Sequence, residues 1–315
     1  MSSEQYNDPR PPSLVQRTLS PVPAASLVAV TTLVVVLVVR LDIPLGDAWD
    51  AIRNIKPSFY LLAVLTHCLT FLFRGARWRL LMANAAQGQE VLFTAPSLKY
   101  STSMMFISWF VTSVTVFRMG DAFRAYAYAR DTASRLSGSI GTVLADRMAD
   151  FVTVLSLMAI AILFLLLEGS AQPKIEYIAI GLALLGGMGL TLAAMLLFRT
   201  WVAHRLPERL RSIYLGFHIG TIGSFRNLHW VFILGALGWT CEVGTWFFVI
   251  EALGAQVSLG LILFIPVANA FLVALQLTPG SLGVLELGVT SLLHLQLPIE
   301  VALAAALVDR TLMIL

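Results

Sequence analysis

Residues 138–167 read GSIGTVLADRMADFVTVLSLMAIAILFLLL, and this stretch decides the fold. A helix needs about 20 consecutive, mostly apolar residues to cross the hydrocarbon core of a bilayer. The stretch is long enough, and its last part, residues 159–167, is entirely apolar. It therefore predicts a transmembrane helix that carries its charged side chains, Asp146, Arg147 and Asp150, in the first half.

The composition extends this prediction to the whole chain. Of the 315 residues, 58% are hydrophobic and 12% are charged, whereas soluble domains carry about 25% charged residues. So few charges cannot cover a water-soluble globule, but they suit a protein whose belt faces lipid. Further apolar windows lie at residues 24–39, 59–82, 177–198, 228–253, 259–277 and 299–315. We expect an all-α, polytopic transmembrane helix bundle with about seven spans.

Two segments differ from these windows and predict re-entrant structure. Residues 94–118 are long enough to cross a bilayer but carry many serines and threonines, and residues 279–295 begin with Pro-Gly-Ser-Leu-Gly. Polar or broken segments at membrane depth are tolerated only where they face protein or a water-filled cavity. Transporters build binding sites from such segments. We therefore expect one or two re-entrant segments in the bundle.

The distribution of arginines predicts the topology. Basic residues cluster around Arg77, Arg124 and Arg209. If residues 94–118 enter the membrane and return, all three clusters lie on the cytoplasmic side, in agreement with the positive-inside rule. If this segment crosses fully, the first two clusters lie on opposite sides. We favour the re-entrant alternative, which gives a multi-pass protein of the cell (inner or cytoplasmic) membrane with a cytoplasmic N-terminus.

The predicted domain organisation is simple. Residues 1–23 are polar and rich in proline and serine, which predicts a disordered N-terminal tail. Residues 24–315 are predicted to form one transmembrane domain. The last apolar window runs to Leu315 without a polar flank, so we expect the C-terminal helix to be truncated there.

Several classes of function are disfavoured by the sequence. The net charge is +3, but the basic residues fall between apolar runs, which predicts membrane orientation and no nucleic-acid partner. The two cysteines and five histidines are scattered without the spacing of a metal site. No nucleophile triad, phosphate-binding loop or dinucleotide-binding glycine pattern occurs. We expect no metal, no cofactor and no active site of an enzyme.

The strongest candidate site contains two aspartates on one helix face. Charged side chains inside membrane helices are costly, so each requires an explanation. Asp146 and Asp150 are four residues apart and share one face, and Arg147 can pair with either. The plain structural alternative is a cytoplasmic helix start, where acids interact favourably with the helix dipole.

A second candidate cluster follows the polar segment. Asp121 and Arg124, just after Gly120, have the spacing of one helix face. Arg118, Arg124 and Arg130 together are suited to an anionic head group, because guanidinium groups match the geometry of phosphate oxygens. The alternative is an ordinary basic loop that only sets the topology.

The third candidate is the break at residues 279–283. Glycines before a helix let backbone N–H groups approach an anion, and the helix dipole assists; the alternative is a plain turn. Glu286 follows in apolar surroundings and needs a cationic partner, for which Arg310 and Arg147 are the candidates. Within the break itself, the candidate residues of the head-group site are Pro279, Gly280 and Gly283.

These motifs occur in a familiar order. They are, along the chain, Arg77-Trp78, Arg118-x-Gly120-Asp121-x-x-Arg124, Asp146-Arg147-x-x-Asp150, Pro279-Gly-Ser-Leu-Gly-x-x-Glu286 and Arg310. Together they resemble the lysylphosphatidylglycerol synthase transmembrane region, also called the flippase-like or UPF0104 family, over nearly the whole chain after residue 24. The departures from the family pattern are Val116 for proline, Asp121 and Asp146 for glutamate, and Ser281 for glycine.

The resemblance implies a function in lipid handling. It implies that the chain translocates or handles an anionic lipid, such as an aminoacylated phospholipid or an isoprenoid-linked glycolipid, between leaflets. The motif residues would then bind the head group. The expected partners are that lipid and a glycosyltransferase or lipid-modifying enzyme of envelope synthesis. Two alternatives stay open: a membrane-embedded lipid transferase with Asp146 or Asp150 as base, and a non-catalytic accessory subunit of envelope lipid or glycan synthesis.

Overall fold

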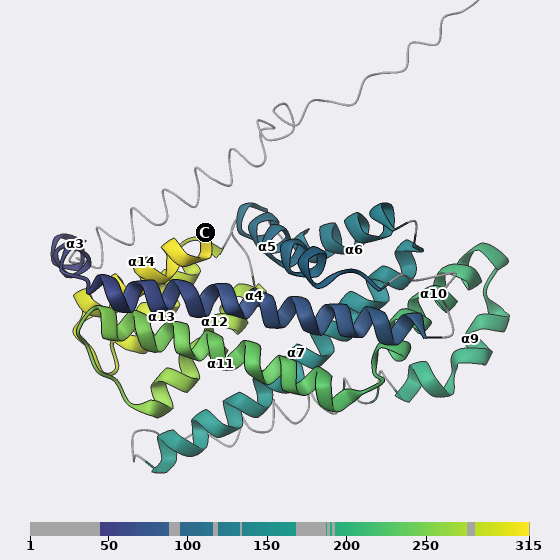
Figure 1. Ribbon diagram of the computed structural model, residues 1–315. Coiled ribbons are helices and arrows are strands. Elements are labelled where there is room, and N and C mark those ends of the chain that lie inside the picture. The colour runs from purple at the N-terminus through teal and green to yellow at the C-terminus, as the bar shows by residue number, and fades with distance from the viewer. Residues whose placement is uncertain are drawn as a thin grey trace, which may run out of the picture. The chain divides into compact units, whose positions relative to one another are not determined.

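The computed structural model describes residues 45–87, 95–115, 119–132, 134–167, 187, 190, 193–275 and 281–314. The chain divides into two units, Met1–Ile43 and Pro44–Leu315, and all described residues belong to the second. Every regular element in this described part is a helix (Figure 1). The helices are α3 (Leu45–Arg53), α4 (Pro57–Ala86), α5 (Leu98–Val114), α6 (Met119–Asp131), α7 (Leu136–Leu167), α9 (Arg199–Arg205), α10 (Glu208–Ser224), α11 (Leu228–Ala252), α12 (Leu259–Leu275), α13 (Val284–Leu293) and α14 (Ile299–Ile314).

Three described helices, α4, α7 and α11, are long and apolar enough to cross a bilayer. They coincide with the predicted windows 59–82, 138–167 and 228–253 and confirm an all-α helical membrane bundle. The windows 259–277 and 299–315 contain α12 and α14, of which the structure describes 17 and 16 residues. The N-terminal tail, the first window and most of the window 177–198 lie outside the described residues.

Small residues set the distance between the neighbouring helices α4 and α11. Gly244 of α11 lies against Thr66, and Gly235 lies against Arg77. Residue numbers rise along one helix while they fall along the other, so the two helices run antiparallel. Small residues at such contacts let membrane helices approach closely, because association in lipid depends on packing rather than on a hydrophobic driving force. At Gly235 the missing side chain also leaves room for the Arg77 guanidinium group.

Helices α5 and α6 form an antiparallel hairpin against α4 (Figure 1). Gly120 lies on Ser108, Arg124 reaches Met105, and the Tyr100 hydroxyl donates to Asp131 Oδ2 at 3.0 Å. The Ser97 hydroxyl begins α5 by accepting the backbone N–H of Tyr100. The segment predicted to be re-entrant, residues 94–118, contains α5, and its re-entry into a membrane stays a prediction.

Replacing Gly120 with alanine should weaken this hairpin. The new methyl group would collide with the Ser108 carbonyl oxygen and the Thr112 hydroxyl of α5. Because the main clash is with backbone, the helices must move apart, and we expect a loss of about 1–3 kcal/mol in the free energy of unfolding. The control is Gly46→Ala in α3, where a methyl group meets nothing within 4 Å. Equal denaturation midpoints of the two variants in detergent would show that the contact does not stabilise the fold.

Candidate functional site

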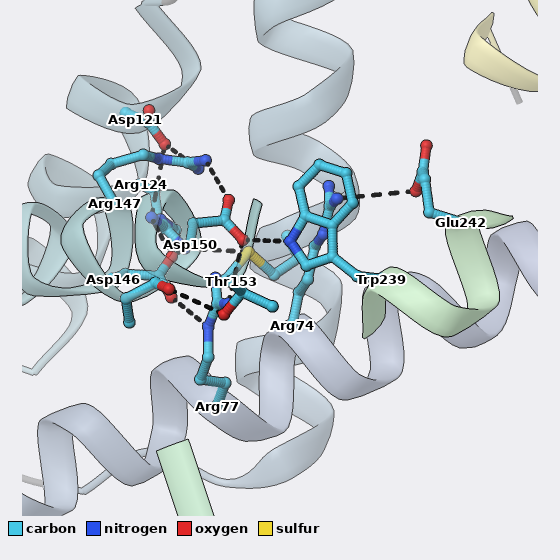
Figure 2. A network of polar contacts seen from close by, with 12 residues as sticks. Arg74, Arg77, Asp121, Arg124, Asp146, Arg147, Asp150, Thr153, Trp239 and Glu242 are labelled. Carbon is cyan, nitrogen blue, oxygen red and sulfur yellow. Dashed lines mark hydrogen bonds and ion pairs between the residues drawn. The ribbon is translucent and has the colours of Figure 1, made fainter. Parts of the chain in front are cut away.

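Ionic side chains from α4, α6 and α7 meet in one network (Figure 2). Arg77 of α4 donates to Asp146 Oδ1 at 2.9 Å and to Asp150 Oδ1 at 3.0 Å. The two aspartates lie one turn apart on α7, so one guanidinium group spans both carboxylates. This confirms that Asp146 and Asp150 share a face. Arg77 is 1% exposed, so it is held entirely by protein.

Arg124 of α6 lies on the opposite side of Asp146. Its two terminal nitrogens donate to Asp146 Oδ2 at 3.2 and 3.1 Å, and one of them lies 3.4 Å from Asp121 Oδ1. The guanidinium carbon lies 4.6 Å from the centre of the Trp78 ring, a favourable cation–π position. Asp121 and Arg124 do share one helix face, and the Arg124 side chain is 0% exposed.

Arg147 is the most exposed of the three arginines in the network. It pairs with Asp121 Oδ1 at 2.8 Å and with Asp150 Oδ2 at 3.2 Å, and its side chain remains 36% exposed. The network thus combines three arginines with three aspartates, and its formal charges cancel. Such balance is needed because an unpaired buried charge costs several kcal/mol.

Two residues of α11 extend the network beyond the sequence motifs (Figure 2). The indole N–H of Trp239 donates to Asp150 Oδ1 at 3.0 Å. Glu242, one turn further on, pairs with Arg74 of α4 at 3.6 Å, and Arg74 also lies over the Trp239 ring at 5.4 Å. The sequence signals for these two residues are an acid and a tryptophan within an apolar helix. A charged side chain there needs a partner of opposite charge, and a buried indole N–H needs a hydrogen-bond acceptor.

A cavity of about 350 Å³ adjoins the exposed side of the network. Its charged lining residues are Arg74, Arg147, Asp150 and Glu242. The rest of the lining is mostly apolar and aromatic and comes from α5, α7, α11 and α12: Trp109, Phe151, Val154, Trp239, Pro266, Asn269, Ala270, Phe271 and Val273. The cavity is therefore amphipathic, with charge concentrated where α4, α7 and α11 meet. Among the described residues, no three His, Cys, Asp or Glu side chains gather as metal ligands would.

The third sequence cluster lies at the start of α13. Glu286 Oε1 lies 3.5 Å from Arg310 Nε, which confirms the prediction that these two residues pair. The other Glu286 oxygen accepts a hydrogen bond from the Gly283 backbone N–H at 2.7 Å. This N–H, which was a candidate to bind an external anion, therefore already has a carboxylate partner within the chain. Gly283 has φ +81°, a conformation that favours glycine. Among the other candidates, Pro279, Gly280 and Arg118 lie outside the described residues.

Comparison with known proteins confirms the family resemblance. The family described as "Lysylphosphatidylglycerol synthase TM region" matches residues 24–315. A UPF0104 membrane protein of Methanocaldococcus jannaschii is 25% identical over 189 residues, which cover 59% of this chain and 80% of that protein. No solved structure matches the chain.

Proposed function

Because the chain belongs to the family of the lysylphosphatidylglycerol synthase TM region, we propose that it binds an anionic lipid head group and moves that lipid between leaflets. The observation that carries the proposal is the amphipathic cavity, in which Arg147 and Arg74 lie beside an apolar wall. A lipid presents the same combination of a charged group and an apolar body. A cavity of about 350 Å³ falls in the usual range of small-molecule sites, roughly 300–1,000 Å³, and suits a head group whose acyl chains remain outside.

Arg147 is the proposed phosphate ligand because it can change partners at low cost. If Arg147 turns to a phosphate, Asp121 still pairs with Arg124, and Asp150 still pairs with Arg77 and accepts from Trp239. Neither acid is left as an unpaired buried charge, which would be costly. A guanidinium group forms two parallel hydrogen bonds to phosphate oxygens and stays charged when partly desolvated.

Arg77 and Arg124 have a different role in this proposal. Both are covered by protein, and carboxylates already occupy several of their donors. Arg77 positions Arg147 at the cavity through Asp150, and Arg124 does so through Asp121. Among the arginines of the sequence motifs, the proposal therefore assigns lipid contact to Arg147 and positioning to Arg77 and Arg124.

The proposal also covers which membrane holds the protein and how the protein is oriented in that membrane. The protein would lie in the cell membrane with the basic groups around Arg77, Arg124 and Arg209 on the cytoplasmic side, following the positive-inside rule. On this topology the network lies towards the cytoplasmic leaflet, since its acids occupy the first half of α7 and its arginines the second half of α4.

The test is a translocation assay with the purified protein in liposomes. Fluorescent phosphatidylglycerol and fluorescent phosphatidylcholine are compared, and a membrane-impermeant quencher reports how fast each reaches the outer leaflet. We expect the protein to accelerate the anionic lipid more than the neutral one, relative to protein-free vesicles. Rates equal to those of protein-free vesicles for both lipids would reject translocation. Equal acceleration of both lipids would reject selectivity for an anionic head group, since both head groups carry a phosphate.

A further inference from the structure

Helix α14 carries an acid inside the apolar core. Asp309 is 4% exposed, and its Oδ2 atom has no hydrogen-bond partner in the described part of the chain. Its neighbours along the helix, Val308 and Leu312, belong to the largest buried apolar cluster, together with Ala305 one turn earlier. Burying an ionised carboxylate without a partner is far more costly than burying the neutral acid. The surroundings of Asp309 therefore favour its protonated form.

Charged groups of both signs lie near Asp309. Glu242 of α11 and Glu286 of α13 repel a negative charge at Asp309, and Arg310 of its own helix attracts one. Arg310, however, is already paired with Glu286, as Glu242 is with Arg74. Helices α3 and α5 also pack on α14. Their charged residues are Asp47, Asp50 and Arg53 on α3 and Lys99 on α5.

We propose that Asp309 is an intramembrane proton-binding site, protonated at neutral pH in the conformation described and linked through Glu242 to the occupancy of the lipid cavity. The proton site stands on the geometry of α14, whereas the link to lipid rests on the proposed function. Glu242 provides the link because it lines the cavity from α11, a helix that packs on α14, and its negative charge repels one at Asp309. It also acts on His67 of α4, a buried side chain whose two ring nitrogens lack partners in the described part of the chain.

The sign of the linkage follows from the charges. An anionic head group beside Arg74 and Glu242 adds negative charge near Asp309 and so favours its protonated form. Linkage is reciprocal, so protonation of Asp309 must favour binding of the anion by the same factor. Binding of an anionic lipid should therefore weaken as the pH rises through the range in which Asp309 loses its proton. In Asp309→Asn, this contribution to the pH dependence should be absent.

Infrared spectroscopy tests the proton site without any lipid movement. The purified protein in nanodiscs of phosphatidylcholine should show the C=O stretching band of a protonated carboxylic acid at neutral pH. We expect Asp309→Asn to lose this band and Glu300→Gln, a half-exposed acid on the same helix, to keep it. A band that survives Asp309→Asn, or its absence from the unmodified protein, would overturn the proton site.

Thermal unfolding provides a second, independent readout. Asparagine has nearly the shape of the neutral acid, so Asp309→Asn should unfold close to the temperature of the unmodified protein. A large drop for Asp309→Asn, but not for Glu300→Gln, would mean that an ionised and paired carboxylate had been lost, and it would overturn the proposal. Loss of the infrared band together with an inactive translocation assay would instead reject the proposed function and leave the proton site standing.

Discussion

Arg77→Ala should unfold or severely destabilise the protein in the membrane. Arg77 joins α4 to two acids of α7 and is covered by protein on all sides. Its removal leaves Asp146 and Asp150 with one positive charge too few inside the bundle. Breaking a buried ion pair from one side typically costs about 3–5 kcal/mol. The measurement is the free energy of unfolding in mixed micelles, with helical content as the signal, together with the yield from the membrane fraction.

A matched arginine separates this effect from a simple loss of charge. Arg130 of α6 pairs with Asp131 at 3.4 Å, but its side chain is 70% exposed, so Arg130→Ala should change stability by less than about 1 kcal/mol. Adding Asp150→Asn to Arg77→Ala removes one of the stranded negative charges and should recover part of the loss. If Arg77→Ala is as stable as Arg130→Ala, the network does not hold the helices together.

Arg147→Ala should abolish lipid handling while the protein stays folded. Each charged hydrogen bond lost to the head group is worth about 1.5–3 kcal/mol, which corresponds to roughly 10- to 100-fold weaker binding. The protein should keep its fold because Asp121 and Asp150 each retain another partner. Arg147→Lys should fail almost as badly, since an ammonium group cannot form the paired hydrogen bonds of a guanidinium group.

The same assay distinguishes a lipid ligand from a residue that only sets topology. Translocation of anionic lipid is measured for Arg147→Ala, Arg147→Lys and the exposed control Arg130→Ala, each at matched protein content. A purely topological arginine would tolerate lysine, because the positive charge remains. Full rates in both Arg147 variants would reject the proposed head-group contact. Arg124→Ala, in contrast, should lower stability first, because Arg124 is buried against Asp146.

The sequence by itself determined the helices and which charges share a helix face. Windows such as 138–167 form helices because the length and continuity of an apolar run are local properties, and a bilayer requires both. The spacing of four between Asp146 and Asp150 placed them on one face, since a helix repeats every 3.6 residues. The need of Glu286 for a partner followed from the cost of an isolated charge in hydrocarbon, and Arg310 is that partner.

Only the tertiary structure decided what each charged side chain faces. Arg77 meets acids 69 and 73 residues away, and no spacing rule reaches that far, because the approach of α4 to α7 depends on side-chain packing along both helices. The same packing buries Arg124, leaves Arg147 at the cavity and brings Arg74 and Trp239 beside it. Residue spacing restricts partners within one helix, whereas burial and pairing between helices are set by close packing of the whole bundle.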